Sequence, residues 1–143
     1  MFDARVVERL ISQYNKKPRL IIAVDFDDTV FDYHKQGHEF AFVISLIKRC
    51  KALGFYIVMF TASQTHRYPF IRQYMSDLGI EIDGINENVV PGLEFGTTTK
   101  MYYNVLLDDR AGLGQAYRTL DNVVSQIEEH NQINDTNETP IAA

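Results

Sequence analysis

The chain has 143 residues, of which 45% are hydrophobic, and it carries a formal net charge of −5 at pH 7. This length predicts one domain, and the apolar content is enough to fill its core, which excludes a chain that is disordered throughout. The negative charge gives no general affinity for nucleic acid, and the lone Cys50 excludes a disulfide framework. The N-terminus lacks a signal-peptide pattern and the apolar runs are too short to span a bilayer, so we expect a cytoplasmic protein without membrane partners.

Hydrophobic periodicity predicts helices and strands in alternation along the chain. The expected elements are a helix at 2–14, a strand at 20–24, a helix at 38–53, a strand at 55–60, a helix at 69–78, a weaker strand at 80–85, a short strand at 104–107 and a helix at 114–130. A flap at 30–37 and a long loop at 86–99 show no clear period, and both are candidates for the rim of a substrate site. The polar residues 131–143 are expected to form a disordered tail.

This alternation predicts a single α/β domain over residues 1–130, built as a three-layer, doubly wound parallel sheet with helices on both faces. The strands of such a sheet all end at the same edge. The polar residues that follow three different strands are therefore expected to converge: Asp25 and Asp27, Thr61, and Asp108 and Asp109.

The first strand ends abruptly in the carboxylates Asp25, Asp27 and Asp28. Asp25 and Asp27 are two residues apart, so they point to the same side if the chain stays extended. Such a pair repels unless a cation or a proton joins it, which indicates a divalent metal site. The alternative is an ordinary polar turn at the end of a strand, and this stretch alone leaves both interpretations open.

Two more carboxylates, Asp108 and Asp109, follow the fourth strand. At an effective dielectric constant near 20, two like charges 4 Å apart repel by about 4 kcal/mol. The cations nearest in sequence, Lys100 and Arg110, cannot balance five carboxylates, whereas Mg²⁺ suits a site made only of oxygen ligands. A carboxylate nucleophile, a metal, the Thr61 hydroxyl and a lysine are the parts that phosphoryl transfer requires.

Taken in order, Asp25-Phe-Asp-Asp-Thr29, Thr61, Lys100 and Asp108-Asp109 resemble the four motifs of the haloacid dehalogenase superfamily. The resemblance covers residues 20–110 and implies a magnesium-dependent phosphomonoester hydrolase that works through an aspartyl-phosphate intermediate. Many relatives carry a cap domain after the first motif or between the second and third motifs. Here the segments from Thr29 to residue 38 and from Thr61 to Lys100 are too short for one. An uncapped, open site suits a bulky phosphate, a nucleotide or a nucleic-acid end, and a second copy in a homo-oligomer would be able to cover it.

The resemblance also implies a role for each motif residue. Asp25 would be the nucleophile, and Asp27 would be the general acid for the leaving group and then the general base for water. Mg²⁺ would bind the Asp25 carboxylate, the Asp27 backbone carbonyl and Asp108, while Asp109 would hold the water shell of the metal or orient Lys100. The residues that contact the phosphorylated substrate would be Thr61, Ala62 and Lys100.

Two alternatives belong to other functional classes. One is a catalytically silent binding module of the same fold, and the other is a receiver-type signalling domain that is phosphorylated on aspartate. Thr61 precedes Lys100, which precedes the last acidic pair, and this order favours the hydrolase over the receiver. His66 and Arg67, just after the second strand, would either touch a phosphate or form a solvated helix start.

Overall fold

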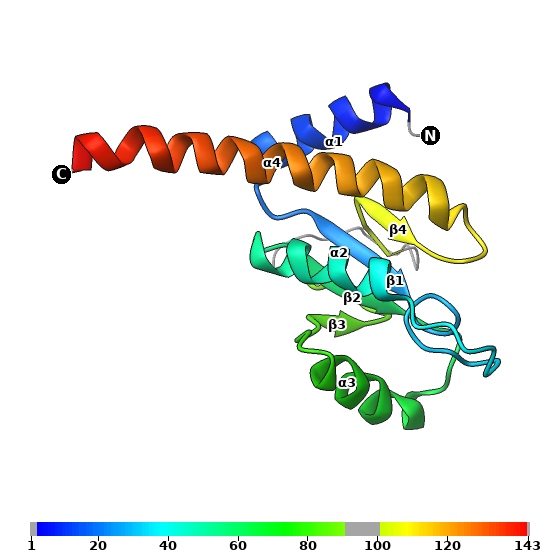
Figure 1. Ribbon diagram of the computed structural model, residues 1–143. Helices are drawn as coiled ribbons and strands as arrows, with labels where there is room; N and C mark the ends of the chain where they lie inside the picture. The colour runs from blue at the N-terminus through cyan, green and yellow to red at the C-terminus, as the bar shows by residue number, and fades with distance from the viewer. Residues whose placement is uncertain (1–2, 91–100, 143) are drawn as a thin grey trace.

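In the computed structural model the described residues are 3–90 and 101–142, with side chains described as far as residue 134 (Figure 1). The elements, in chain order, are α1 (Ala4–Lys16), β1 (Ile21–Asp25), α2 (Ala41–Ala52), β2 (Tyr56–Phe60), the short 3₁₀ helix η1 (Thr65–Arg67), α3 (Tyr68–Asp77), β3 (Gly84–Ile85), β4 (Val105–Leu107) and α4 (Leu113–Ala142). None of the described helices is long and apolar enough to cross a membrane.

The four strands form one sheet in the order β3-β2-β1-β4, and all pairs are parallel. The register places Asp25 of β1 opposite Phe60 of β2, and Val24 opposite Leu107 of β4. The predicted α/β class with a parallel sheet flanked by helices is therefore confirmed, and the arrangement is consistent with a Rossmann-like three-layer fold. The carboxyl ends of β1, β2 and β4 lie at one edge of the sheet.

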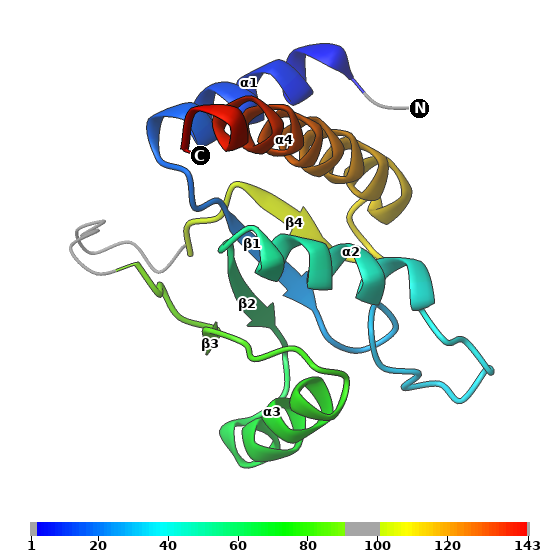
Figure 2. The same cartoon turned by 60° about the vertical axis from the view of Figure 1, so that its left-hand side comes forward.

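The helices are distributed around this sheet (Figures 1 and 2). Helices α1 and α4 lie side by side next to β4, α2 packs on β2, and α3 lies at the β3 end. Arg49 ties α2 to α4 through ion pairs with Asp121 at 2.6 Å and Glu128 at 2.8 Å. This contact gives Arg49 a structural role between the two helices.

The core forms where the sequence has uninterrupted apolar runs. In β1 the side chains of Ile22, Ala23 and Val24 are fully buried, as expected for a strand that is covered on both faces. Helix α4 contributes side chains spaced three and four residues apart, which lie on one helical face. These buried α4 residues are Leu120, Val123, Val124 and Ile127.

Three expectations differ from the structure. Helix α2 begins at Ala41 and not at residue 38, because Phe40 has a left-handed φ of 51°. Strand β3 is confined to two residues of the predicted 80–85. Helix α4 continues to Ala142, where a disordered tail was expected from residue 131.

Gly84 in β3 has no room for a side chain. An added Cβ would lie 2.5 Å from Cγ1 of Val89 and 2.8 Å from Oε1 of Glu87. We expect Gly84→Ala to lower the free energy of unfolding by about 1–3 kcal/mol, the usual cost of overpacking, in urea denaturation. The matched control is Gly114→Ala, where the nearest atoms are 3.6 Å away, and it should cause no loss. Equal stability of the two variants would contradict the crowding at β3.

Candidate active site

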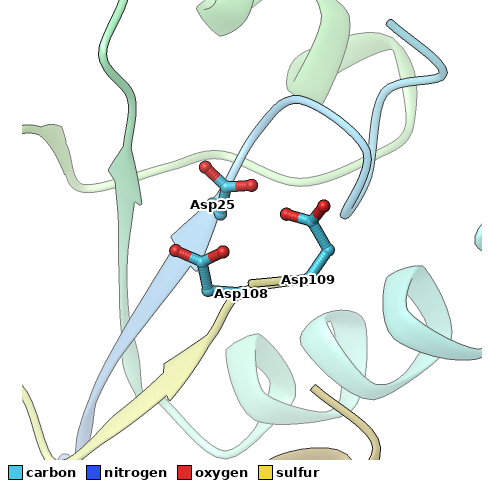
Figure 3. Close-up of side chains that lie close together, drawn as sticks. All are labelled: Asp25, Asp108 and Asp109. Atoms are coloured by element: carbon cyan, nitrogen blue, oxygen red, sulfur yellow. The ribbon is translucent and has the colours of Figure 1, made fainter. Parts of the chain in front are cut away.

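Three carboxylates gather at the carboxyl edge of the sheet (Figure 3). Asp25 is the last residue of β1, and Asp108 and Asp109 directly follow β4, so the parallel pairing of these strands brings the three together. One carboxylate oxygen from each lies within 4.8 Å of the other two. Asp25 and Asp108 are half-buried and Asp109 is exposed. The predicted convergence of residues after the strand ends is confirmed for this carboxylate trio, as we call Asp25, Asp108 and Asp109 below.

Thr29 connects the two strand ends that carry the trio. Its side chain is fully buried, and its hydroxyl donates to Oδ2 of Asp25 at 3.2 Å. The same oxygen accepts the backbone N–H of Asp109 at 3.1 Å. The sequence placed Thr29 in the first motif but predicted no role for it. Its spacing of four residues from Asp25 is the signal that would have pointed to this contact.

The Asp25 carboxyl has an unusual environment. Burial raises its pKa to about 7, and a hydrogen bond between the Asp25 and Asp109 carboxyl groups and the charge of Asp108 act in the same direction. Without a cation the trio would therefore hold a proton below about pH 7. Oxygens on opposite sides of one Mg²⁺ lie about 4.2 Å apart, so the trio is close to the spacing that one ion requires, and its all-oxygen chemistry fits magnesium.

Asp27 does not belong to the trio, because its carboxylate forms a bidentate ion pair with Arg67. Nη1 and Nη2 of Arg67 donate to its two oxygens at 2.7 and 2.8 Å, and Nη1 also donates to Oγ of Ser63 at 2.6 Å. The guanidinium lies 5.3–5.9 Å from the centres of four aromatic rings. These rings belong to Phe26, Phe31, Tyr33 and Phe70.

This ion pair shows that Arg67 is not a solvated helix start, whereas contact with a phosphate stays a prediction. The available signal was its position shortly after β2, the strand next to β1, since parallel neighbours end at the same edge. Asp28 makes local contacts in the turn after β1. It accepts the backbone N–H of His34 at 3.4 Å and contacts the imidazole of the same residue.

Asn86 is the first residue of the loop predicted to form the rim, and it lines the cleft and shapes the end of β2. Its side chain accepts the backbone N–H of Thr61 at 2.9 Å and donates to the carbonyl of Thr61 at 2.7 Å and to the hydroxyl of Tyr68 at 3.0 Å. Its φ of 52° is left-handed, a conformation that asparagine tolerates better than most residues. An asparagine just after a strand end was the signal for this role.

The carboxylates open into a cleft of about 820 Å³. Thr61 and Ala62, two of the predicted substrate-binding residues, line it, and the flap borders it through Tyr33 and His34. The third, Lys100, lies outside the described residues, as do residues 91–99 of the loop that was predicted to form the rim. A second cavity of about 690 Å³ lies at the opposite edge of the sheet, and the described residues around it include no carboxylate.

Comparison with known proteins supports the fold and goes no further. No family model matches the chain, and no curated protein matches it in sequence. A solved structure of a conserved protein from Bacteroides thetaiotaomicron is similar, with a TM-score of 0.53 and 22% sequence identity. The similarity covers 64% of this chain and 77% of that chain, and at this identity it shows the α/β fold alone.

The Arg67–Asp27 pair is expected to contribute to stability, because both side chains are mostly covered, with 21% and 31% exposed. Arg67→Met removes three N–H donors, so we expect the free energy of unfolding to fall by about 1–3 kcal/mol in urea denaturation. Arg5→Met is the matched control, since its pair with Asp3 has an arginine that is 90% exposed, and it should leave stability nearly unchanged. An equal effect of both substitutions would show that the Arg67 pair is no stronger than a surface contact.

Magnesium should stabilise the protein more at pH 8 than at pH 5.5. The pKa of Asp25 is about 7 when folded and near 3.8 when unfolded, so between these values the folded state binds the extra proton. The stability that this proton gives is complete below pH 3.8 and is lost as the pH rises through 7. Mg²⁺ competes with the proton, so millimolar Mg²⁺ should raise Tm mainly at the higher pH.

Calorimetry of the wild type and of Asp25→Asn measures this effect. The asparagine cannot titrate, so the variant should lose most of the pH dependence of the magnesium response. Equal increases of Tm at both pH values in the wild type would exclude a proton shared by the trio. Absence of any increase at pH 8 would exclude the metal site.

Proposed function

We propose that the protein is a magnesium-dependent phosphomonoester hydrolase with Asp25 as its nucleophile. The observation that carries the proposal is the carboxylate trio, with its oxygens within 4.8 Å of one another in an open cleft. Chain segments about 80 residues apart bring these like charges together, an arrangement that weakens the apo fold unless a cation is bound. The resemblance of the ordered motifs to the haloacid dehalogenase superfamily supports the same activity.

Asp25 would act in two steps. A carboxylate oxygen of Asp25 attacks phosphorus, the bond from phosphorus to the ester oxygen breaks, and the leaving alkoxide takes up a proton. Water then attacks the phosphorus of the aspartyl phosphate and gives up a proton, and the bond to Asp25 breaks to release inorganic phosphate. The hydrogen bond from Thr29 holds the attacking carboxylate in place.

Mg²⁺, when bound, would neutralise charge on the nucleophile and on the phosphate. The residues that would hold it are Asp25 and Asp108, with the backbone carbonyl of Asp27 as the resemblance implies. Asp109 belongs to the same trio and would either bind the ion directly or hold its water shell. Thr61, Ala62 and Lys100 would contact the phosphate oxygens, as the motif order implies.

Asp27 would donate the proton to the leaving group and later accept one from water. Arg67 occupies both oxygens of this carboxylate, so the first transfer requires the pair to open. This contact is the observation that favours the second candidate function, a binding module of the same fold that holds a phosphate group without hydrolysing it. Such a module is expected if the pair never opens.

Substitution of the nucleophile tests the activity. Asp25→Asn should reduce turnover of an aryl phosphate by at least about 10³-fold, because an amide cannot form the covalent intermediate. The matched control is Asp77→Asn, since Asp77 is an exposed carboxylate on α3 that does not line the cleft, and it should retain full activity. Circular dichroism should show both variants folded. Turnover retained by Asp25→Asn would remove Asp25 as nucleophile.

Chelation tests the metal. Activity should disappear with EDTA and return when Mg²⁺ is added in excess, because without a cation the unbalanced negative charge of the trio would repel an anionic phosphate. Turnover that persists in EDTA would contradict the proposed role of the trio. Magnesium-dependent binding of inorganic phosphate without any turnover would favour the binding module.

A further inference from the structure

The cleft next to the trio has an aromatic wall that the proposed chemistry does not use. Tyr33, in the flap, lines the cleft although its side chain is 55% exposed. Phe60, at the end of β2, and Tyr103, just before β4, also line it, with their rings edge to face at 5.6 Å. An exposed aromatic ring beside a reactive site is a surface that a ligand can cover.

The Tyr33 ring packs against Arg67 and His34. The Arg67 guanidinium lies over its ring, 5.7 Å from the centre, and the His34 imidazole packs edge-on at 5.1 Å. Arg67 is itself fixed by Asp27 and Ser63. Because one face of the Tyr33 ring is backed by Arg67, the exposed part is a pre-positioned stacking platform, which loses little conformational freedom when a ligand binds.

The polar side chains along the described part of the cleft are mostly used within the protein. Both polar atoms of the Asn86 amide are bonded to neighbouring groups. The Asp27 carboxylate is paired with Arg67, and Asp28 contacts His34. A flat aromatic ring does not need these partners, because it can stack on the exposed part of the Tyr33 ring.

We propose that this cleft selects phosphate monoesters that carry a flat aromatic ring, of the size of a nucleoside monophosphate, and that Tyr33 stacks on that ring. This inference rests on the proposed hydrolase function of the same cleft. A volume of about 820 Å³ accommodates such a molecule, and the acidic cleft together with the net charge of −5 disfavours a longer polyanion.

The test compares a substrate that has an aromatic base with one that lacks it. Adenosine 5′-monophosphate and ribose 5-phosphate share the sugar and the phosphate, so the ratio of their kcat/KM values reports recognition of the base. We expect a preference of about tenfold or more for the nucleotide, the effect that stacking of one base on an aromatic side chain gives. Similar kcat/KM values for the two substrates would overturn the inference and leave the hydrolase proposal intact.

Variants of Tyr33 locate the effect. Tyr33→Ala should raise KM for the nucleotide about tenfold and leave ribose 5-phosphate unchanged, and Tyr33→Phe should restore the preference. The matched control is Phe42→Ala, because Phe42 is 79% exposed on α2 and does not line the cleft, and it should change neither substrate. Equal losses for both substrates in Tyr33→Ala would show that the ring only supports Arg67, which overturns the stacking role.

A binding measurement separates this inference from the activity itself. If the wild type hydrolyses neither substrate and no aryl phosphate, the hydrolase proposal fails, and calorimetry of the wild type with Mg²⁺ still compares the affinities of the two ligands. Tighter binding of the nucleotide by about tenfold supports ring recognition, and equal affinities overturn it. A 5′-phosphorylated oligonucleotide that is hydrolysed or bound better than the mononucleotide would overturn the proposed size.

Discussion

The repulsion within the carboxylate trio is the constraint on which the rest of the site depends. Two strands that are adjacent in space but separated by about 80 residues in sequence end side by side, and each ends in a carboxylate. At distances near 4 Å such charges oppose folding by an amount comparable with a large fraction of the stability of a small domain. Two local features reduce this repulsion: the hydrogen bond from the Thr29 hydroxyl to Asp25, and a proton on Asp25, whose pKa is raised to about 7. Neither feature neutralises all three carboxylates, so a bound cation would stabilise the site further.

The parts of this arrangement that could be predicted are those set by strand direction. Apolar runs such as 20–24 identify buried strands, alternation with helices makes the strands parallel, and parallel strands end at one edge. The sequence therefore predicted that Asp25 and Asp108 lie at the same edge of the sheet, although it did not predict the strand register. The bounds of β3 and the exposure of Phe42 depend instead on tertiary packing, because a short apolar run does not say which of its side chains face a neighbour.

Side-chain partners were the least predictable part of the site. Whether Arg67 reaches Asp27, a phosphate or solvent depends on the turn formed by 61–67 and on the rings around the guanidinium, and none of these has a periodic signature. Asn86 is similar, since its amide closes the end of β2 through contacts that form only once β3 has paired. The residue type alone indicated a metal site for the carboxylates. The partners of Arg67 and Asn86 became clear only from the structure.

Arg67 also joins two properties of the proposed enzyme that are usually discussed separately. One guanidinium holds the Asp27 carboxylate and backs the Tyr33 ring, so both contacts depend on the position of this one side chain. In the proposed reaction Arg67 would have to leave Asp27 before the first proton transfer, while the ring of a substrate would stack on the part of Tyr33 that Arg67 does not cover. Recognition of the organic part of a substrate and release of the proton-transfer group would then meet at a single cation.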